Sequence, residues 1–279
     1  MKKYIDIEKG FTHSGKFHAD DVFSAALLTI LNPDIKIERG FQVPEDFDGI
    51  VFDIGFGEFD HHQQDREVRD NQIPYAAFGL LWKKYGSLLV GEEEAKRFDE
   101  KFIQSLDMND NTGSENEIAD VISVFNPPWD WAVSSDKAFE EAKELAYKIL
   151  VKEIEHIKSI NRAEELVTKA LKGLEDGILV LPRSAPWKKF VKEKEVNFVI
   201  YPSNRGGYCA QAVQKDDKPN ELKIPFPENW RGVEKELIGS VSGVETLQFC
   251  HNSGFLISAL TLEDIIKACK ITAELANEK

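Results

Sequence analysis

The run Gly49-Ile50-Val51-Phe52-Asp53-Ile54-Gly55 is continuously apolar, is bounded by glycines and is interrupted by a single aspartate, Asp53. Such a run is typical of a buried strand in a parallel sheet. An unpaired carboxylate among apolar neighbours costs several kcal/mol or is forced to take up a proton. We therefore expect a cation or strong hydrogen bonds to hold Asp53.

The segments before this run predict an α/β fold. Apolar residues recur at helical spacing over residues 22–31, behind an acidic helix N-terminus at Asp20 and Asp21. Residues 35–39 alternate between apolar and polar side chains, as a strand does. A strand, a helix and two further strands in this order indicate a parallel, doubly wound sheet, whose ligands gather at the carboxyl ends of its strands. Asp53 would lie at that edge.

Histidines are concentrated in the same part of the chain. Four of the six lie between positions 13 and 62, each within seven residues of an aspartate. Neutral imidazoles mixed with carboxylates favour Mn, Fe or Zn over Ca. His61 and His62 are adjacent and their side chains diverge, so we expect one to bind metal and the other to face substrate. For the loop of His13, His18 and Asp20 alone, a structural role explains the residues equally well, because surface His and Asp are common.

Two further carboxylates, Asp107 and Asp110, lie one helical turn apart near the end of a helix predicted over residues 92–108. Either one can complete a metal site. The alternative is a simple polar helix end that borders the turn-rich residues 109–113.

Length and pattern predict two domains joined by a helical connector. A chain of 279 residues is long for one core. Residues 1–134 are predicted to form the α/β metal-binding domain. Residues 135–176 have the apolar stripe and charged opposite face of one long or two consecutive helices. Short strands, turn residues and a last helix predict a smaller α+β domain over residues 177–279.

Composition narrows the function classes. The formal net charge of -14 argues against a protein that coats duplex nucleic acid, but not against an enzyme that grips a strand end at a metal-lined cleft. Acidic residues interrupt the apolar runs, so neither a signal peptide nor a membrane span is predicted. Cys209, Cys250 and Cys269 are widely spaced without a CxxC pair, which is typical of a reducing compartment. We expect a cytoplasmic protein that binds no membrane.

Five motifs, spread over nearly the whole chain, resemble one family. The run Asp60-His61-His62-Gln63, preceded by Asp53 and the His13 loop, is similar to the motif set of the DHH phosphoesterase superfamily. The full set more closely resembles the melanocyte-proliferating-gene exonuclease family. The five motifs of this set are Thr12-His13-x-Gly15-x-Phe17-His18-x-Asp20, Asp60-His61-His62-Gln63, Ser184-Ala185-Pro186-Trp187-Lys188, Pro227-Glu228-x-Trp230-Arg231-Gly232 and His251-x-Ser253-Gly254-Phe255.

The resemblance implies a DHH-like N-terminal domain that holds two Mn²⁺ ions, with other divalent metals left open. The implied ligands are His13 and His18 for the first ion, Asp20, His61 and Asp107 for the second, and Asp53 as the bridge. We favour Asp107 over Asp110 as the helix aspartate. The superfamily usually has an aspartate where this chain offers His18, one residue further along, so the metal preference stays open.

The same resemblance implies a metal-dependent phosphodiesterase, a 3'-to-5' exonuclease acting on RNA or short oligonucleotides. Two metal ions suit in-line displacement at phosphorus, with Asp53 and His62 as catalytic residues and His62 contacting a phosphate oxygen. The substrate-binding candidates of the second domain are His251, Ser253, Gly254, Arg231 and Lys188, each of which also has a purely structural explanation. The alternatives are a small-molecule phosphoesterase or pyrophosphatase, and a non-enzymatic metal-binding regulatory protein. Homo-oligomerisation is left open.

Overall fold

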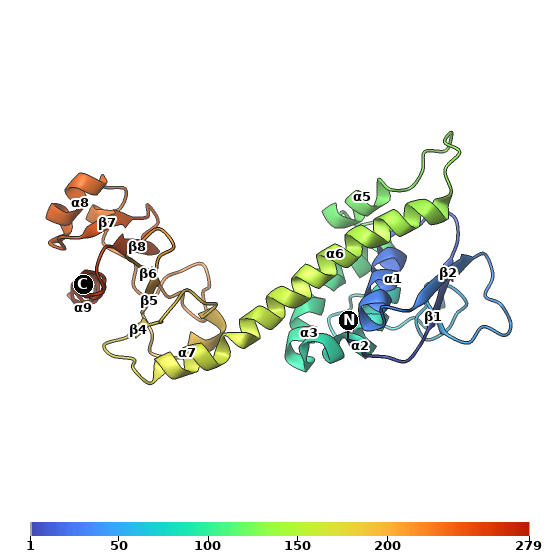
Figure 1. Cartoon of the computed structure of the whole chain (residues 1–279), viewed down its shortest axis with the longest axis horizontal. Helices are drawn as coiled ribbons and strands as arrows, with labels where there is room; N and C mark the ends of the chain where they lie inside the picture. The colour runs from blue at the N-terminus through green and yellow to red at the C-terminus, as the bar shows by residue number, and fades with distance from the viewer. Residues whose placement is uncertain (1, 279) are drawn as a thin grey trace. The chain divides into compact units, whose positions relative to one another are not determined.

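The computed structural model describes residues 2–278, and the chain divides into two compact units, one ending at Lys158 and the other beginning at Ser159 (Figure 1). The elements that begin in the first unit are β1 (Lys9–His13), α1 (Ala19–Leu31), β2 (Lys36–Gly40), β3 (Ile50–Val51), α2 (Ala77–Val90), α3 (Glu92–Phe98), the π-helix η1 (Asp99–Ile103), α4 (Gln104–Thr112), α5 (Glu117–Ser123) and α6 (Ser135–Arg162).

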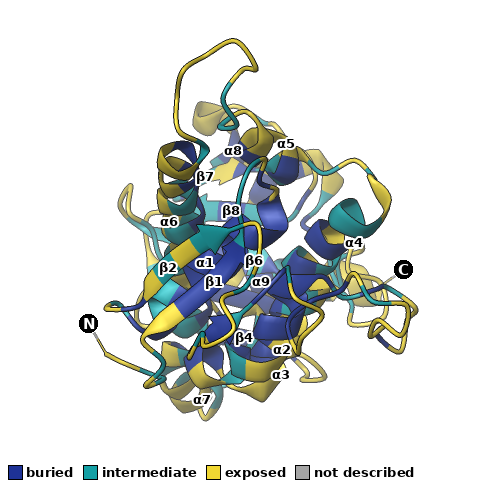
Figure 2. Cartoon of the chain, turned by 90° about the vertical axis from the view of Figure 1, so that its right-hand side faces the viewer, coloured by how far each residue is buried: buried dark blue, intermediate teal, exposed yellow. Residues whose placement is uncertain are grey.

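The sheet of the first unit has the strand order β2-β1-β3, and both strand pairs are parallel, as predicted. Helix α1 covers one face, where Gly10 of β1 leaves room for the side chain of Leu28. On the other face Phe11 packs edge-on against Phe47, with ring centroids 5.4 Å apart. The middle of β1 is buried, as Figure 2 shows. The doubly wound arrangement, with helices on both faces of this sheet, stays a prediction.

Strand β3 is shorter than the apolar run that predicted it. The amide of Phe52 still donates to the carbonyl of Phe11 in β1, at 3.0 Å. Asp53 then has a φ of 55°, in the left-handed region, which an aspartate tolerates better than a bulky apolar residue. The chain therefore leaves the sheet at Asp53 and places this residue at the carboxyl edge.

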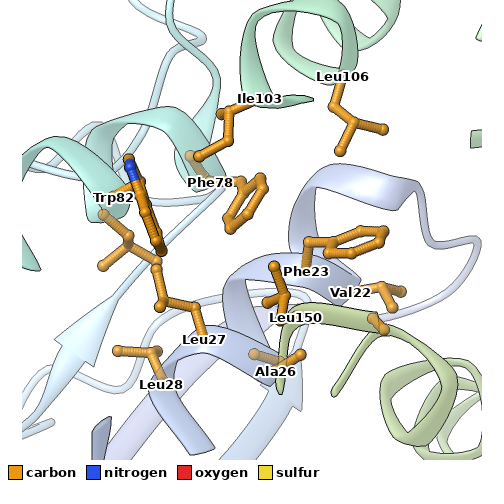
Figure 3. Close-up of a cluster of buried hydrophobic side chains, with 14 of the residues drawn as sticks. Val22, Phe23, Ala26, Leu27, Leu28, Phe78, Trp82, Ile103, Leu106 and Leu150 are labelled. Atoms are coloured by element: carbon orange, nitrogen blue, oxygen red, sulfur yellow. The ribbon is translucent and has the colours of Figure 1, made fainter. Parts of the chain in front are cut away.

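Helices α1, α2, α4 and α6 bury one apolar core in the first unit (Figure 3). Phe23 of α1 lies near Phe78 of α2, with ring centroids 5.5 Å apart, and Trp82 stacks obliquely on Phe98 at 4.8 Å. Leu150 of α6 belongs to the same core. Most of the predicted connector is thus a core helix of the first unit, because its apolar stripe has a partner there.

The second unit carries a mixed five-stranded sheet of order β4-β5-β6-β8-β7, in which only β4 and β5 are parallel. Its elements are α7 (Glu164–Leu171), β4 (Ile178–Val180), the 3-10 helix η2 (Lys188–Val191), β5 (Phe198–Pro202), β6 (Tyr208–Ala212), the 3-10 helix η3 (Glu228–Trp230), α8 (Lys235–Ser242), β7 (Leu247–Cys250), β8 (Leu256–Ala259) and α9 (Leu262–Asn277).

Helix boundaries differ from the predictions in two places. The helix predicted over residues 92–108 is continued by the π-helical turn η1 and extends through α4 to Thr112. The helical stretch predicted from residue 135 is two consecutive helices, α6 and α7, one of the two forms expected. None of the helices between residues 2 and 278 combines the length and the apolar character that a membrane span needs.

Candidate metal centre

The carboxyl ends of β1 and β3, the start of α1 and the end of α4 meet at a cleft of about 1100 Å³ in the first unit. Its walls carry histidines, aspartates and side-chain amides. The titratable residues along it are His13, His18, Asp53, Asp60, His61, His62, Arg66 and Asp110.

Asp53 stands between two imidazoles. Its Oδ2 lies 3.2 Å from His13 Nε2, and its Oδ1 lies 3.1 Å from His61 Nε2. The residue is 4% exposed, so both contacts are shielded from water. The two oxygens of this one carboxylate therefore belong to two different groups of side chains.

The first group consists of His13, Asp21 and Asp53, whose ligand-type atoms lie within 4.8 Å of one another. His13 Nδ1 lies 3.2 Å from the carbonyl of Ser14, which turns Nε2 toward the carboxylates, 3.3 Å from Asp21 Oδ2. Metal-binding histidines have this arrangement, since the other ring nitrogen usually donates to a carbonyl or carboxylate. Asp21 Oδ1 accepts the amide of His18, at 2.8 Å, at the start of α1.

The second group consists of Asp20, His61 and Asp110. His61 Nε2 lies 3.1 Å from Asp110 Oδ2, the same distance as from Asp53 Oδ1. The oxygens of Asp20 accept the amides of Ala77 and Phe78 at 3.0 and 2.8 Å, which anchors this carboxylate to the start of α2. A carboxylate has about four acceptor positions, so Asp20 keeps capacity for a further partner.

Asp60 fixes the orientation of His62. Its Oδ1 accepts His62 Nδ1 at 2.6 Å and the His61 amide at 2.7 Å, and its Oδ2 accepts the Phe56 amide at 2.7 Å. Burial raises the pKa of Asp60, but these hydrogen bonds outweigh burial and hold the pKa below its ordinary value. His62 also belongs to a third group with Asp53 and His61, and its side chain is 56% exposed. Asp60 thus binds one ring nitrogen of His62, and His62 is the most exposed imidazole of the three groups.

The carboxylates of the centre repel one another in a buried setting. Burial, followed by the charge of Asp53, raises the pKa of Asp21 to about 7. The same two causes, with Asp110, raise the pKa of Asp20. Burial also raises the pKa of Asp53, but hydrogen bonds from His13 and His61 bring it down to about 2. The pKa of Asp53 is thus shifted in the opposite direction from the pKa values of Asp20 and Asp21.

The imidazoles respond in the opposite direction. Burial lowers the pKa of His13, but its hydrogen bond to Asp53 and the charge of Asp21 raise it to about 9. Burial likewise lowers the pKa of His61, and hydrogen bonds to Asp110 and Asp53 raise it to about 11. The neighbouring carboxylates therefore favour the positively charged form of both imidazoles.

The residues present fit divalent cations. Asp21 Oδ2 is fully buried and accepts no hydrogen bond from any described residue; it has only the 3.3 Å contact with His13 Nε2, and an incompletely satisfied buried oxygen is costly. Across the described chain, no lysine or arginine forms an ion pair with Asp20, Asp21, Asp53 or Asp110. A donor set of imidazole nitrogens and carboxylate oxygens suits Mn, Fe or Zn.

Asp107, the favoured helix aspartate, lies elsewhere. It is fully buried, and its Oδ2 accepts Arg69 NH2 at 2.6 Å while its Oδ1 accepts the amide of Gly79 at 3.2 Å. Arg69 also bonds Asp99 through Nε and NH2, at 2.9 and 2.5 Å. A Cβ atom at Gly79 would collide with Asp107 Oδ2, so the carboxylate occupies the space beside this glycine. Asp110 takes the place that was expected for Asp107, because the helix turns it toward His61.

His18 is the other predicted ligand that the structure leaves outside the three groups. It is the N-cap residue of α1 with an extended backbone, and its half-exposed ring points into the cleft. Its Nδ1 lies 3.9 Å from Asp110 Oδ1, beyond hydrogen-bond distance. Asp21 therefore replaces His18 beside His13. A sequence signal for Asp21 existed: successive helix residues point about 100° apart, so Asp20 and Asp21 can serve two neighbouring groups.

In the second unit, four of the five predicted substrate-binding residues come together at one turn. Ser253 donates its amide to His251 Nδ1 at 3.1 Å, and its hydroxyl lies 2.9 Å from the same nitrogen. The neutral ring therefore carries its proton on Nε2. Arg231 donates Nε and NH2 to the carbonyl of Phe226, and a Cβ atom at Gly254 would come within 2.7 Å of Arg231 Nε.

Lys188 lies in η2, exposed, and no hydrogen bond or ion pair between described residues links it to the His251 turn. Trp187 and Val191 beside it pack in a cluster of their own, separate from the cluster that contains Trp230.

Comparison with known proteins gives a consistent result. The profile of the uncharacterised protein family UPF0160, MYG1_exonuc, matches residues 10–272. The MYG1 protein of Schizosaccharomyces pombe is 28% identical over 93% of this chain and 95% of its own. The MYG1 exonuclease of Homo sapiens is 27% identical over 94% of this chain and 84% of its own, and the MYG1 protein of Chlamydia pneumoniae is 26% identical over 94% and 96%. No solved structure matches. The profile match covers nearly the whole chain and confirms the resemblance to the exonuclease family; this protein belongs to the MYG1 family, UPF0160.

Proposed function

We propose that this protein is a metal-dependent phosphodiesterase, an exonuclease that acts on RNA or short oligonucleotides with two divalent cations, Mn²⁺ in the first instance. One observation carries the proposal: the two oxygens of Asp53 face His13 and His61, each of which belongs to its own group of carboxylates. That is the arrangement of a bridging ligand. The printed name of the human relative, MYG1 exonuclease, supports nucleic acid as the substrate. The DHH fold and the 3'-to-5' polarity rest on the sequence resemblance.

The chain would hold the two cations with the groups described above. His13 and Asp21 serve the first, His61, Asp110 and Asp20 the second, and Asp53 both. Bound here, two divalent cations supply Lewis acidity toward phosphoryl oxygens and lower the pKa of water for attack on phosphorus. The protein's part is to hold these donors in fixed positions, and binding of the cations would displace the protons from the imidazoles.

His62 is the residue proposed to meet the substrate. Because Asp60 takes its Nδ1, the exposed Nε2 is the ring nitrogen that can reach a phosphate oxygen. In the protonated ring this nitrogen donates a charge-assisted hydrogen bond to the phosphate. Asp60 thereby positions the imidazole without touching the substrate.

The turn of His251, Ser253, Gly254 and Arg231 remains a proposed substrate site of the second unit. His251 Nε2–H is the donor proposed to contact the substrate, because Nδ1 is already hydrogen-bonded to Ser253. Arg231 spends two nitrogens on Phe226 and acts mainly as a support for the turn. Lys188 is proposed only as an exposed cation toward a phosphate backbone.

A second candidate is hydrolysis of small phosphate compounds such as pyrophosphate. Of the described residues that line the cleft, Arg66 alone is a lysine or arginine, which favours short substrates over a long charged strand.

The test uses three substrates: a fluorescent single-stranded RNA, a dinucleotide and pyrophosphate, each with Mn²⁺ and with chelator. We expect Mn²⁺-dependent cleavage of the RNA or the dinucleotide, abolished by chelator. Cleavage of pyrophosphate alone would establish the second candidate. Cleavage of none of them, by protein with Mn²⁺ bound in elemental analysis, would leave a metal-binding protein without this activity.

A further inference from the structure

Phe56 is an aromatic residue on the wall of the cleft, in the turn between Asp53 and Asp60. Its side chain is 73% exposed, although most of the phenylalanines of the first unit are buried in its core. A single exposed apolar residue needs no explanation by itself. Its backbone and its connection to His62 make this one different.

The backbone of Phe56 adopts a conformation that its side chain disfavours. Its φ is 56°, in the left-handed region, where a bulky residue is a true outlier and glycine is at ease. Such outliers persist where the surrounding structure holds them, and they gather at functional sites. Here the holding contact is the 2.7 Å hydrogen bond from the Phe56 amide to Asp60 Oδ2.

That hydrogen bond ties Phe56 to the imidazole that faces substrate. Asp60 accepts Phe56 on one oxygen and His62 Nδ1 on the other. The backbone amide of Phe56 and the imidazole of His62 are thus bonded to opposite oxygens of one carboxylate, and both residues line the same cleft. Because both residues line the same cleft, a ligand whose phosphate contacts His62 shares that cleft with the ring of Phe56.

The other groups along the cleft suit a base better than a second phosphate. Arg66 is the single cationic side chain of the lining apart from histidines, and it already donates to Asn111 Oδ1 at 2.9 Å. Side-chain amides are more numerous, and such groups hydrogen-bond base edges. The amides in the lining are Gln63, Gln64, Asn109 and Asn111; the last two already form hydrogen bonds within the protein, which leaves Gln63 and Gln64 for a base.

We propose that Phe56 is a stacking platform for a nucleobase of the substrate, which makes the centre selective for phosphodiesters that carry bases. The inference rests on the proposed function, since it assumes that a phosphate binds at His62. Aromatic side chains stack on any base, so the platform gives affinity without sequence preference. Phe56 is a binding residue here, and the chemistry is left to the metal centre.

The test compares two dinucleotides, one with 2-aminopurine as both bases and one with two abasic sugars, with the full-length protein and Mn²⁺. Phe56→Gly removes the ring and tolerates the positive φ, so the turn is preserved; Phe56→Trp keeps a stacking surface. Phe41→Ala is the matched control, because Phe41 is 81% exposed but does not line the cleft. Thermal unfolding verifies that each variant is folded.

For Phe56→Gly we expect KM for the base-bearing dinucleotide to rise about tenfold, within the range for loss of one stacked base. KM for the abasic substrate and kcat should stay the same, and Phe56→Trp and Phe41→Ala should resemble the unaltered protein. The 2-aminopurine fluorescence, read on mixing and before turnover, should be quenched by the unaltered protein and much less by Phe56→Gly.

Equal quenching by the unaltered protein and Phe56→Gly, or equal changes in KM for both dinucleotides, would overturn the stacking platform. The proposed function has a separate readout. Quenching that depends on Phe56, without hydrolysis, would support the stacking platform and reject the proposed hydrolase. Hydrolysis without such quenching would support the hydrolase and reject the stacking platform.

Discussion

Two clusters of carboxylates lie in the first unit, and they differ in that one contains an arginine and the other contains histidines. The Arg69 cluster consists of Arg69, Asp99 and Asp107, and its guanidinium is bonded to both carboxylates. The Asp53 cluster consists of Asp20, Asp21, Asp53 and Asp110 with His13 and His61, and none of its six members is a lysine or arginine.

The comparison indicates that the side chain facing a carboxylate determines whether the carboxylate is neutralised within the fold or can bind a cation. Asp107 and Asp110 lie one turn apart on α4, yet the first is neutralised by Arg69 and the second faces His61. Arg69 is further fixed by the ring of Tyr75, 3.8 Å from the guanidinium carbon. A cluster with a permanent cation is neutralised within the fold, whereas a cluster of imidazoles and carboxylates without one could hold a metal ion.

The largest effect is expected for Asp53→Asn, which removes one charge from both groups of the Asp53 cluster at constant size. Metal ions are worth several kcal/mol to the transition state, so phosphodiesterase activity should fall at least about a thousandfold. Initial rates with Mn²⁺ measure this, and elemental analysis should show that bound Mn²⁺ is lost while circular dichroism is unchanged. Retained activity would show that Asp53 does not bridge two ions.

For the Arg69 cluster the expected loss is stability. Arg69→Met leaves buried carboxylates without their cation, which costs about 3–5 kcal/mol of unfolding free energy. Urea denaturation measures the loss. Arg66→Met is the control, because Arg66 is exposed and its change should stay within about 0.5 kcal/mol. A loss of equal size in both variants would remove the distinction between the clusters.

Metal binding separates the two aspartates of α4. Mn²⁺ at a hundredfold excess over its Kd should stabilise the protein by about 2.7 kcal/mol. Asp107→Asn should lower the baseline stability and keep this Mn²⁺ increment, whereas Asp110→Asn should reduce the increment. Thermal melts of both variants with and without Mn²⁺ decide the matter, and the opposite pattern would return Asp107 to the metal site.

The smallest effect is a pH dependence of the metal-free protein. The pKa of Asp21 rises from 3.8 to about 7 on folding, so the folded state binds more protons in this range and stability falls as pH rises. The pKa of His13, raised from 6.5 to about 9, gives the same sign at higher pH. Melting temperatures in chelator should therefore decline from about pH 5 to 8. Asp21→Asn should flatten the decline, and a rise with pH in the unaltered protein would contradict the charge balance described here.

Local sequence pattern determined much of the fold. The apolar run at residues 49–55 and the alternation at 35–39 became strands of the parallel sheet, and the helical periodicity after Asp20 became α1. These features depend on neighbours in the sequence, since burial on one face repeats with the period of the element. The family resemblance was equally a property of the sequence.

Part of the candidate centre could be predicted in the same way. Asp53 and the His13 loop were predicted to lie together because a polar residue at the end of a buried strand is conspicuous and because parallel strands end at one edge, and His61 was added by the family resemblance. In the structure, Asp53 lies between the two histidines, 3.2 Å from His13 Nε2 and 3.1 Å from His61 Nε2.

Tertiary structure alone decided which further carboxylates lie beside these three residues. Asp107 is withdrawn from the centre by Arg69, which is 38 residues away in the chain, and no local pattern reports such a pair. His18 and Asp21 are both near His13 in sequence, but the direction of the helix start sends Asp21 inward and His18 to the cleft surface. Sequence fixes which residues can bind a cation; long-range packing fixes which carboxylates already have a partner and which still need one.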